Sequence, residues 1–79
     1  MASVTVLYFA ALREDRGLSE EVLDVPDGTS LAALYQTIFA ASPLLAMPVA
    51  YACNHDYASG DVALKDGDEI CFLPPLGGG

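Results

Sequence analysis

The sequence predicts a two-layer α+β fold, in which a mixed sheet of four to five strands packs on one main helix. Three observations support this class. Two strand-like runs come first, a single amphipathic helical stretch follows them, and shorter strand-like runs complete the 79 residues. A chain of this length forms one small domain that buries only about 60% of its unfolded surface. Because one helix covers one face of a sheet, we expect two layers.

The first part of the chain predicts a β-hairpin. Residues 4–9 (VTVLYF) are β-branched or aromatic and predict the first strand, and residues 20–25 (EEVLDV) predict the second. The polar stretch 10–17 between them predicts a helical turn and a loop. Residues 26–28 (PDG) predict a tight turn after the second strand.

The main helix is predicted to follow this turn. Thr29 or Ser30 is suited to cap it by accepting a hydrogen bond from an unpaired backbone N–H. Apolar residues then recur at the spacing of one helical stripe: Leu31, Leu34, Tyr35, Ile38 and Phe39. Ser42 precedes a proline and is pushed out of the α region, so we expect the helix to end there. Residues 43–48 are expected to form an apolar loop.

Three further strands are predicted in the second half. Residues 49–53 (VAYAC) predict the third strand, residues 61–63 a short edge strand, and residues 69–73 (EICFL) the last. Turns are predicted at residues 54–56 and at the Asp-Gly pair 66–67.

This order of elements is typical of the β-grasp, or ubiquitin-like, arrangement. In that arrangement the first and last strands run parallel at the centre of the sheet. We therefore assign residues 1–73 to one β-grasp domain and residues 74–79 to an extended C-terminal tail of proline and glycine.

Side-chain alternation predicts an apolar patch on the sheet face that the helix does not cover, because successive strand residues point to opposite faces. The residues assigned to the helix side are Val4, Val6, Ile70 and Phe72. The residues assigned to the open side are Leu7, Phe9, Cys71 and Leu73. An exposed patch of this kind indicates a partner site. The alternative is that the apolar loop 43–48 covers it.

The charge of the chain restricts its partners. Eleven acidic and three basic residues give a net charge of −8, which excludes nucleic acid and favours a basic partner surface. An acidic surface also provides solubility. No apolar stretch approaches the ~18 residues of a membrane span, and no signal-peptide pattern precedes the first strand. With only two cysteines, a cytoplasmic protein is expected.

The side chains offer little chemistry of their own. Cys53, His55 and Cys71 match no zinc-ligand spacing, so we expect no metal site and no bound cofactor. His55 lies in a predicted turn without a nucleophile beside it. Arg13 and Arg16 belong to a charged run that predicts a solvated loop with weak ion pairs.

The C-terminal tail carries the distinctive group of the chain, the α-carboxylate of Gly79. Pro74 and Pro75 favour an extended stem, and the six residues 74–79 reach about 20 Å when extended. Leu76 is followed by three glycines, which allow close approach to another backbone. Such a tail is suited to enter a partner's active site. The alternative is a frayed end or linker.

Three segments resemble a known family. Residues 6–14 (VLYFAALRE), 66–70 (DGDEI) and 72–79 (FLPPLGGG) are similar to the small subunit of molybdopterin synthase, and Asn54 also fits. The resemblance spans nearly the whole chain in order and length. Position 77 is often serine or alanine in that family, so Gly77 is a departure that loosens the tail.

The resemblance implies a sulfur carrier that is not an enzyme alone. An adenylating, E1-like activating enzyme uses ATP on the Gly79 carboxylate, and a sulfur donor protein converts it to a thiocarboxylate. Pro74, Pro75, Leu76, Gly77 and Gly78 then insert with Gly79 into the large subunit. There the thiocarboxylate donates sulfur to cyclic pyranopterin monophosphate, within a heterotetramer.

The resemblance also assigns partner contacts. Phe9, Tyr57 and Leu73 match family positions that contact partners, and Phe9 and Leu73 also belong to the patch derived from strand alternation. Leu7 is predicted to bind partners from that patch alone. Other readings remain. The chain is alternatively a sulfur carrier for thiamine, cysteine or tRNA thiolation, or a ubiquitin-like modifier or interaction domain. The Pro-Pro stem favours the molybdopterin branch.

Overall fold

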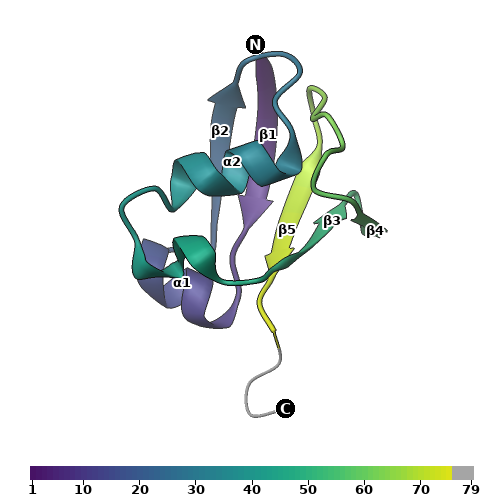
Figure 1. The fold of residues 1–79 in the computed structure, drawn as a ribbon. Helices are drawn as coiled ribbons and strands as arrows, with labels where there is room; N and C mark the ends of the chain where they lie inside the picture. Colours follow the sequence, from purple (N-terminus) through teal and green to yellow (C-terminus); the bar gives the residue numbers. More distant parts are fainter. Residues whose placement is uncertain (76–79) are drawn as a thin grey trace.

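The computed structural model describes residues 1–75, in which a five-stranded sheet carries the helices on one face (Figure 1). The elements are β1 (Ala2–Leu7), α1 (Ala10–Arg16), β2 (Glu20–Val25), α2 (Leu31–Ile38), the 3₁₀ turn η1 (Pro43–Ala46), β3 (Ala50–Cys53), β4 (Asp56–Ala58) and β5 (Glu69–Leu73). The predictions for Leu76, Gly77, Gly78 and Gly79 lie outside the described residues. No helix among residues 1–75 has the length and apolar character needed to cross a membrane.

The sheet has the strand order β2-β1-β5-β3-β4. Its central strands β1 and β5 run parallel, with Val6 beside Ile70, and every other pair is antiparallel. The α+β class and the parallel central pair are thus confirmed. β2 and β5 have the predicted bounds, whereas β1 begins and ends two residues earlier than expected and leaves Tyr8 and Phe9 beyond its end.

The main helix α2 forms where its apolar stripe predicts. The Ser30 hydroxyl accepts a hydrogen bond from the backbone N–H of Ala33 at 3.1 Å and caps the first turn. Phe39 ends the helix, three residues before the predicted Ser42. The predicted loop 43–48 begins with η1, because the Ser42 side chain accepts from the Leu44 N–H at 3.0 Å and starts a second short turn.

The core lies between α2 and the covered face of the sheet, and its centre is aromatic. The ring centroid of Tyr35 lies 4.7 Å from that of Phe39 and 5.1 Å from that of Phe72. The Tyr35 hydroxyl donates to the Leu44 carbonyl at 2.7 Å, which ties η1 to the core. Leu44, Leu45 and Met47 pack against the core from its rim. The helix-side assignment of Val4, Val6, Ile70 and Phe72 is correct, since all four are buried.

The expectation of a turn and loop at residues 10–17 was wrong, because this stretch forms the helix α1. Leu12 is fully buried and anchors the helix to the core. Gly17, with φ +76°, ends it by donating its N–H to the Arg13 carbonyl at 2.9 Å. One buried residue among polar neighbours is too sparse a pattern to predict a helix.

The predicted edge strand was also misplaced. The edge strand is β4, and the predicted segment 61–63 forms only an isolated bridge from Ala63 to Ser30. The turn after β3 needs only two residues, Asn54 and His55, so the chain returns beside β3 immediately. Asp56, predicted to belong to the turn, therefore begins the strand.

Candidate functional site

The open face of the sheet carries a continuous apolar row. Leu7 pairs with Cys71, Cys71 with Ala52, and Ala52 with Tyr57, across β1, β5, β3 and β4. Directly paired residues project from the same face of a sheet. The alternation of side chains thus places residues from four strands on one surface, and the predicted patch extends further than Leu7, Phe9, Cys71 and Leu73 alone.

Two neighbouring hollows shape this surface. The larger, of about 590 Å³, is lined by Phe9, Ala10, Pro48, Ala50, Tyr57, Leu73, Pro74 and Pro75. The smaller, of about 280 Å³, is lined by Phe9, Ala52, His55, Tyr57, Cys71 and Leu73. We call the residues of both hollows together the docking face.

The structure brings three of the predicted partner residues together. Phe9, Tyr57 and Leu73 line both hollows, although they are far apart in the chain. Leu7 is half-buried beside Cys71 and lines neither hollow, so it borders the docking face. Pro48 and Ala10 were not predicted, because only the folded chain brings β3 and α1 beside the end of β5.

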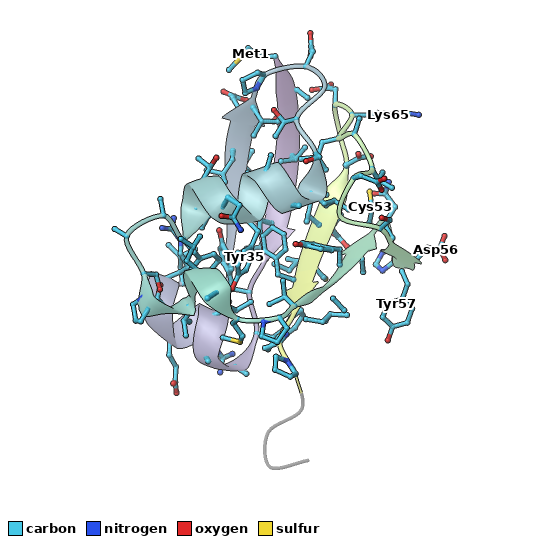
Figure 2. All side chains as sticks on the ribbon, viewed as in Figure 1. Met1, Tyr35, Cys53, Asp56, Tyr57 and Lys65 are labelled. Atoms are coloured by element: carbon cyan, nitrogen blue, oxygen red, sulfur yellow. The ribbon has the colours of Figure 1, made fainter. Side chains whose placement is uncertain are left out.

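Two aromatic rings of the docking face are strongly exposed. Phe9 is 46% exposed and Tyr57 is 83% exposed. Tyr57 projects away from the body of the protein at the β4 edge (Figure 2). Water is a poor environment for these rings, and clustered exposed apolar groups are typical of a surface that another protein covers. The loop 43–48 does not cover them, because its apolar side chains Leu44, Leu45 and Met47 pack on the core instead.

The backbone at the end of β1 directs Phe9 outward. Phe9 is extended, with φ −130° and ψ 153°, and Ala10 follows with φ +50°. A positive φ at a non-glycine residue costs roughly 1–2 kcal/mol. The Phe9 carbonyl accepts from the Leu12 N–H at 3.1 Å, so the start of α1 holds this bend.

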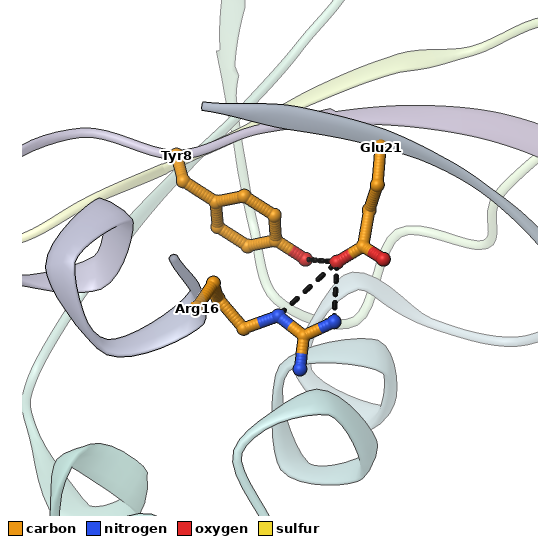
Figure 3. Close-up of polar contacts among 3 residues, drawn as sticks. All are labelled: Tyr8, Arg16 and Glu21. Carbon is orange, nitrogen blue, oxygen red and sulfur yellow. Dashed lines mark hydrogen bonds and ion pairs between the residues drawn. The ribbon is translucent and has the colours of Figure 1, made fainter. Parts of the chain in front are cut away.

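A polar cluster behind the docking face ties α1 to the sheet (Figure 3). The Tyr8 hydroxyl donates to Glu21 Oε2 at 2.6 Å, and the same oxygen accepts from Arg16 Nε at 3.1 Å and Nη2 at 2.6 Å. Burial and the hydrogen bond to Glu21 raise the pKa of Tyr8 far above its usual range. Burial alone would raise the pKa of Glu21, but the donors Tyr8 and Arg16 hold it below the usual carboxyl value. The prediction of weak, solvated ion pairs was wrong for Arg16.

This cluster leads to a testable dependence of stability on pH. We expect Tyr8→Phe to lower the free energy of unfolding by about 1–3 kcal/mol at pH 7, because a donor to a carboxylate is lost. The lowered pKa of Glu21 means that its stabilising effect is complete above about pH 4.3, the unfolded value, and is lost as the pH falls through the folded value. The difference between variant and parent should therefore shrink by pH 3.

Urea unfolding followed by circular dichroism at both pH values measures this difference. Tyr51→Phe is the matched control, since it removes a hydroxyl from a half-buried ring on the same side of the sheet. An equal loss at pH 7 and pH 3 would contradict the role given to the Glu21 carboxylate.

The two cysteines and the histidine have different surroundings in the structure. Cys53 packs against the core, whereas Cys71 lies on the docking face, and both are free thiols whose pKa burial raises. His55 Nε2 lies 3.3 Å from Glu69 Oε1 at an exposed position. Within residues 1–75 no group of three metal-ligating side chains is gathered.

The docking face leads directly into the predicted tail stem. Pro74 and Pro75 follow β5 and line the larger hollow together with Phe9 and Leu73. Glu20 and Glu69 project from the same sheet face, next to Leu7 and Thr5 respectively, and give this face an acidic border. The arrangement is suited to binding a partner that is apolar at its centre and basic at its border, with the tail leaving from the contact.

Comparison with known proteins identifies the family to which the chain is similar. Residues 6–79 match the ThiS family. The molybdopterin synthase sulfur carrier subunit of Chlamydomonas reinhardtii is 40% identical over 96% of this chain and 98% of that relative. The putative molybdopterin converting factor subunit 1 of Pyrococcus furiosus superposes with a TM-score of 0.84 at 30% identity, covering 96% of this chain and all of that one.

A further solved structure contains a partner. In the complex of subunits 1 and 2 of the molybdopterin-converting factor from Helicobacter pylori, the matching chain has a TM-score of 0.64 and 29% identity. The match covers 98% of this chain and 99% of that one. A protein of similar size and fold is thus known in complex with a second subunit.

Proposed function

Because the chain belongs to the ThiS family, we propose that it is the sulfur carrier subunit of molybdopterin synthase, with its C-terminal carboxylate as the reacting group. The observation that carries the proposal is the continuity of the docking face with the Pro74-Pro75 stem. A carrier must bind a partner and present its chain end to that partner at the same time. Here the surface for binding and the start of the tail are one surface.

The chemistry proceeds at Gly79. Attack of its carboxylate on the α-phosphate of ATP forms an acyl-adenylate and releases pyrophosphate. Sulfide then attacks the acyl carbon and expels AMP, which leaves a thiocarboxylate. With a protein persulfide as donor, the first product is an acyl disulfide, and a second thiol reduces it to the thiocarboxylate. Because adenylation consumes ATP, we expect the carrier to act in the cytoplasm.

Three protein partners follow from this chemistry: an adenylating enzyme, a sulfur donor protein and the large subunit of molybdopterin synthase. The carrier holds no ATP itself, because the activating enzyme supplies the nucleotide site. The large subunit accepts residues 74–79 and binds cyclic pyranopterin monophosphate, to which the thiocarboxylate gives its sulfur. The acidic border of the docking face, with Glu20 and Glu69, favours basic residues around each partner's apolar contact.

The test is reconstitution from purified components. The protein is incubated with ATP, the activating enzyme and a sulfur source, and its intact mass is measured. Replacement of one oxygen by sulfur, followed by formation of molybdopterin when the large subunit and cyclic pyranopterin monophosphate are added, supports the proposal. A thiocarboxylate that supplies another thiolation reaction but not this one would assign the carrier to a different pathway.

Phe9 provides a test of the docking face. We expect Phe9→Asp to weaken binding of the large subunit by about 30-fold or more, because a central aromatic contact is replaced by a charge that binding must desolvate. Isothermal titration calorimetry measures the affinity. The melting temperature should change little, since Phe9 lies outside the buried core.

The matched control introduces the same charge elsewhere. Gln36→Asp lies on the exposed side of α2, away from the open sheet face, and should leave the affinity unchanged. A large fall in melting temperature for Phe9→Asp with unchanged affinity would instead make Phe9 a core residue.

A further inference from the structure

The strand that carries Tyr57 is too short to fix the position of the Tyr57 ring by itself. β4 has three residues, lies at the edge of the sheet and pairs only with β3. Tyr57 is its middle residue and is 83% exposed, so the packing of its own side chain does not hold it in place. The position of its ring on the docking face therefore depends on the turn that joins β3 to β4.

That turn has an unusual sequence for its conformation. Asn54 has φ +53° and His55 has φ +74°, the signs that a type I′ hairpin turn has at its two central positions. Asparagine and histidine tolerate a positive φ better than most residues, but glycine is the preferred second residue of such a turn and adopts it without cost. The turn thus needs contacts elsewhere to hold it.

Asn54 supplies those contacts by binding the start of β5. Its backbone N–H donates to the Glu69 carbonyl at 2.8 Å, and its Oδ1 accepts from the Glu69 N–H at 2.9 Å. Its Nδ2 donates to Asp68 Oδ1 at 2.9 Å. The turn is therefore bound to the strand that also carries Leu73 and the tail stem.

Asp68, which binds the Asn54 side chain, is itself held by the protein. Its side chain is buried although it is charged, and its second oxygen accepts a hydrogen bond from the Lys65 N–H at 2.7 Å. Burial alone would raise the pKa of Asp68, but the donors Lys65, Asn54 and Cys53 lower it below the usual value. At neutral pH the carboxylate is charged, with both oxygens accepting hydrogen bonds.

We infer that Asn54 and Asp68 are positioning residues that hold Tyr57 on the docking face, and that they thereby set the affinity for the large subunit. The inference rests on the proposed function, because the large subunit is its partner. The hydrogen bonds join the turn to β5, so Tyr57 and Leu73 are kept at a fixed separation on one surface. A partner then meets a preorganised pair of contacts instead of ordering a mobile edge strand.

A double-mutant cycle tests the inference. Asn54→Gly still allows the turn to form, because glycine tolerates a positive φ, but it removes the side-chain hydrogen bonds to Asp68 and Glu69. We expect it to weaken binding of the purified large subunit from the same organism about tenfold, and about twofold or less when Tyr57 is already alanine. Equal losses in both backgrounds, or no loss in either, would overturn the positioning role.

Asp68→Asn is the second variant, with Asp61→Asn in an exposed loop as its control. An amide has one oxygen where Asp68 uses two, so one of its hydrogen bonds to Asn54 and Lys65 is lost in either orientation. We expect weaker binding for Asp68→Asn only.

A measurement without partner separates this inference from the proposed function. Hydrogen exchange by NMR should become faster at residues 56–58 in Asn54→Gly, while exchange in β1 and β5 stays slow. Unchanged exchange at residues 56–58 would overturn the inference. If the wild-type chain fails to bind the large subunit, the proposed function fails, and the exchange data alone then decide whether Asn54 holds β4.

Discussion

A chain that lacks Gly79 is expected to lose sulfur transfer completely and to unfold at the same temperature as the full-length protein. The reason is that the carboxylate proposed to react is moved one residue back, while the core consists of residues between Ala2 and Phe72. Intact mass after incubation with ATP, activating enzyme and sulfur source measures the first effect. Circular dichroism on heating measures the second.

A matched control keeps the tail length. Semisynthesis with a C-terminal amide at Gly79 leaves every residue in place but removes the carboxylate. We expect the amide to bind the large subunit as the parent does and to form no acyl-adenylate. If the truncated chain still accumulates a thiocarboxylate and makes molybdopterin, the chemistry proposed for Gly79 is wrong.

Phe72→Ala is expected to unfold much of the protein at 25 °C. Phe72 is fully buried, and its ring lies 5.1 Å from the Tyr35 ring and 5.9 Å from the Tyr51 ring. Replacing a buried phenylalanine by alanine costs about 3–5 kcal/mol. A single core in a chain of this length supplies about 3–5 kcal/mol of net stability, so little remains.

Urea unfolding measures this loss. The control is Val22→Ala, because Val22 is 65% exposed on the outer strand β2 and should cost about 0.5 kcal/mol or less. A loss near 1 kcal/mol for Phe72→Ala would mean that the neighbouring rings close over the cavity.

The elements that sequence predicted well are those with a regular repeat of buried residues. The stripe from Leu31 to Phe39 identified α2, and alternation in β5 separated buried Ile70 and Phe72 from Cys71 and Leu73. A repeat of this kind separates the buried face of a helix or strand from its exposed face. It therefore predicts both the secondary structure and the face that stays open.

The elements that sequence missed depend on contacts between distant residues. α1 has one buried residue, Leu12, and is held by Arg16 reaching Glu21 on β2. The turn that leads into β4 is bound through Asn54 to Asp68 and Glu69, some fifteen residues later in the chain. A local sequence pattern does not show which acidic residue Arg16 or Asn54 will bind, because the chain contains eleven acidic residues.

The candidate site shows the same division. Alternation along the strands indicated Phe9 and Leu73, and the resemblance to the small synthase subunit indicated Tyr57. The structure places all three around shared hollows. It adds Pro48 and Ala50, which reach the site because β3 pairs with β5, with Ala50 beside Leu73. Such pairing between strands is a property of the whole fold.

The parallel pairing of β1 with β5 has a consequence for biosynthesis. Thr5 of the first strand pairs with Glu69 of the last, so the central sheet cannot form during synthesis until β5 has been translated. A product of premature termination that lacks β5 would leave β1 without its central neighbour and remain a substrate for proteases. Molecules that fold and meet a partner should therefore all contain β5, from whose end the Pro74-Pro75 stem leaves the domain.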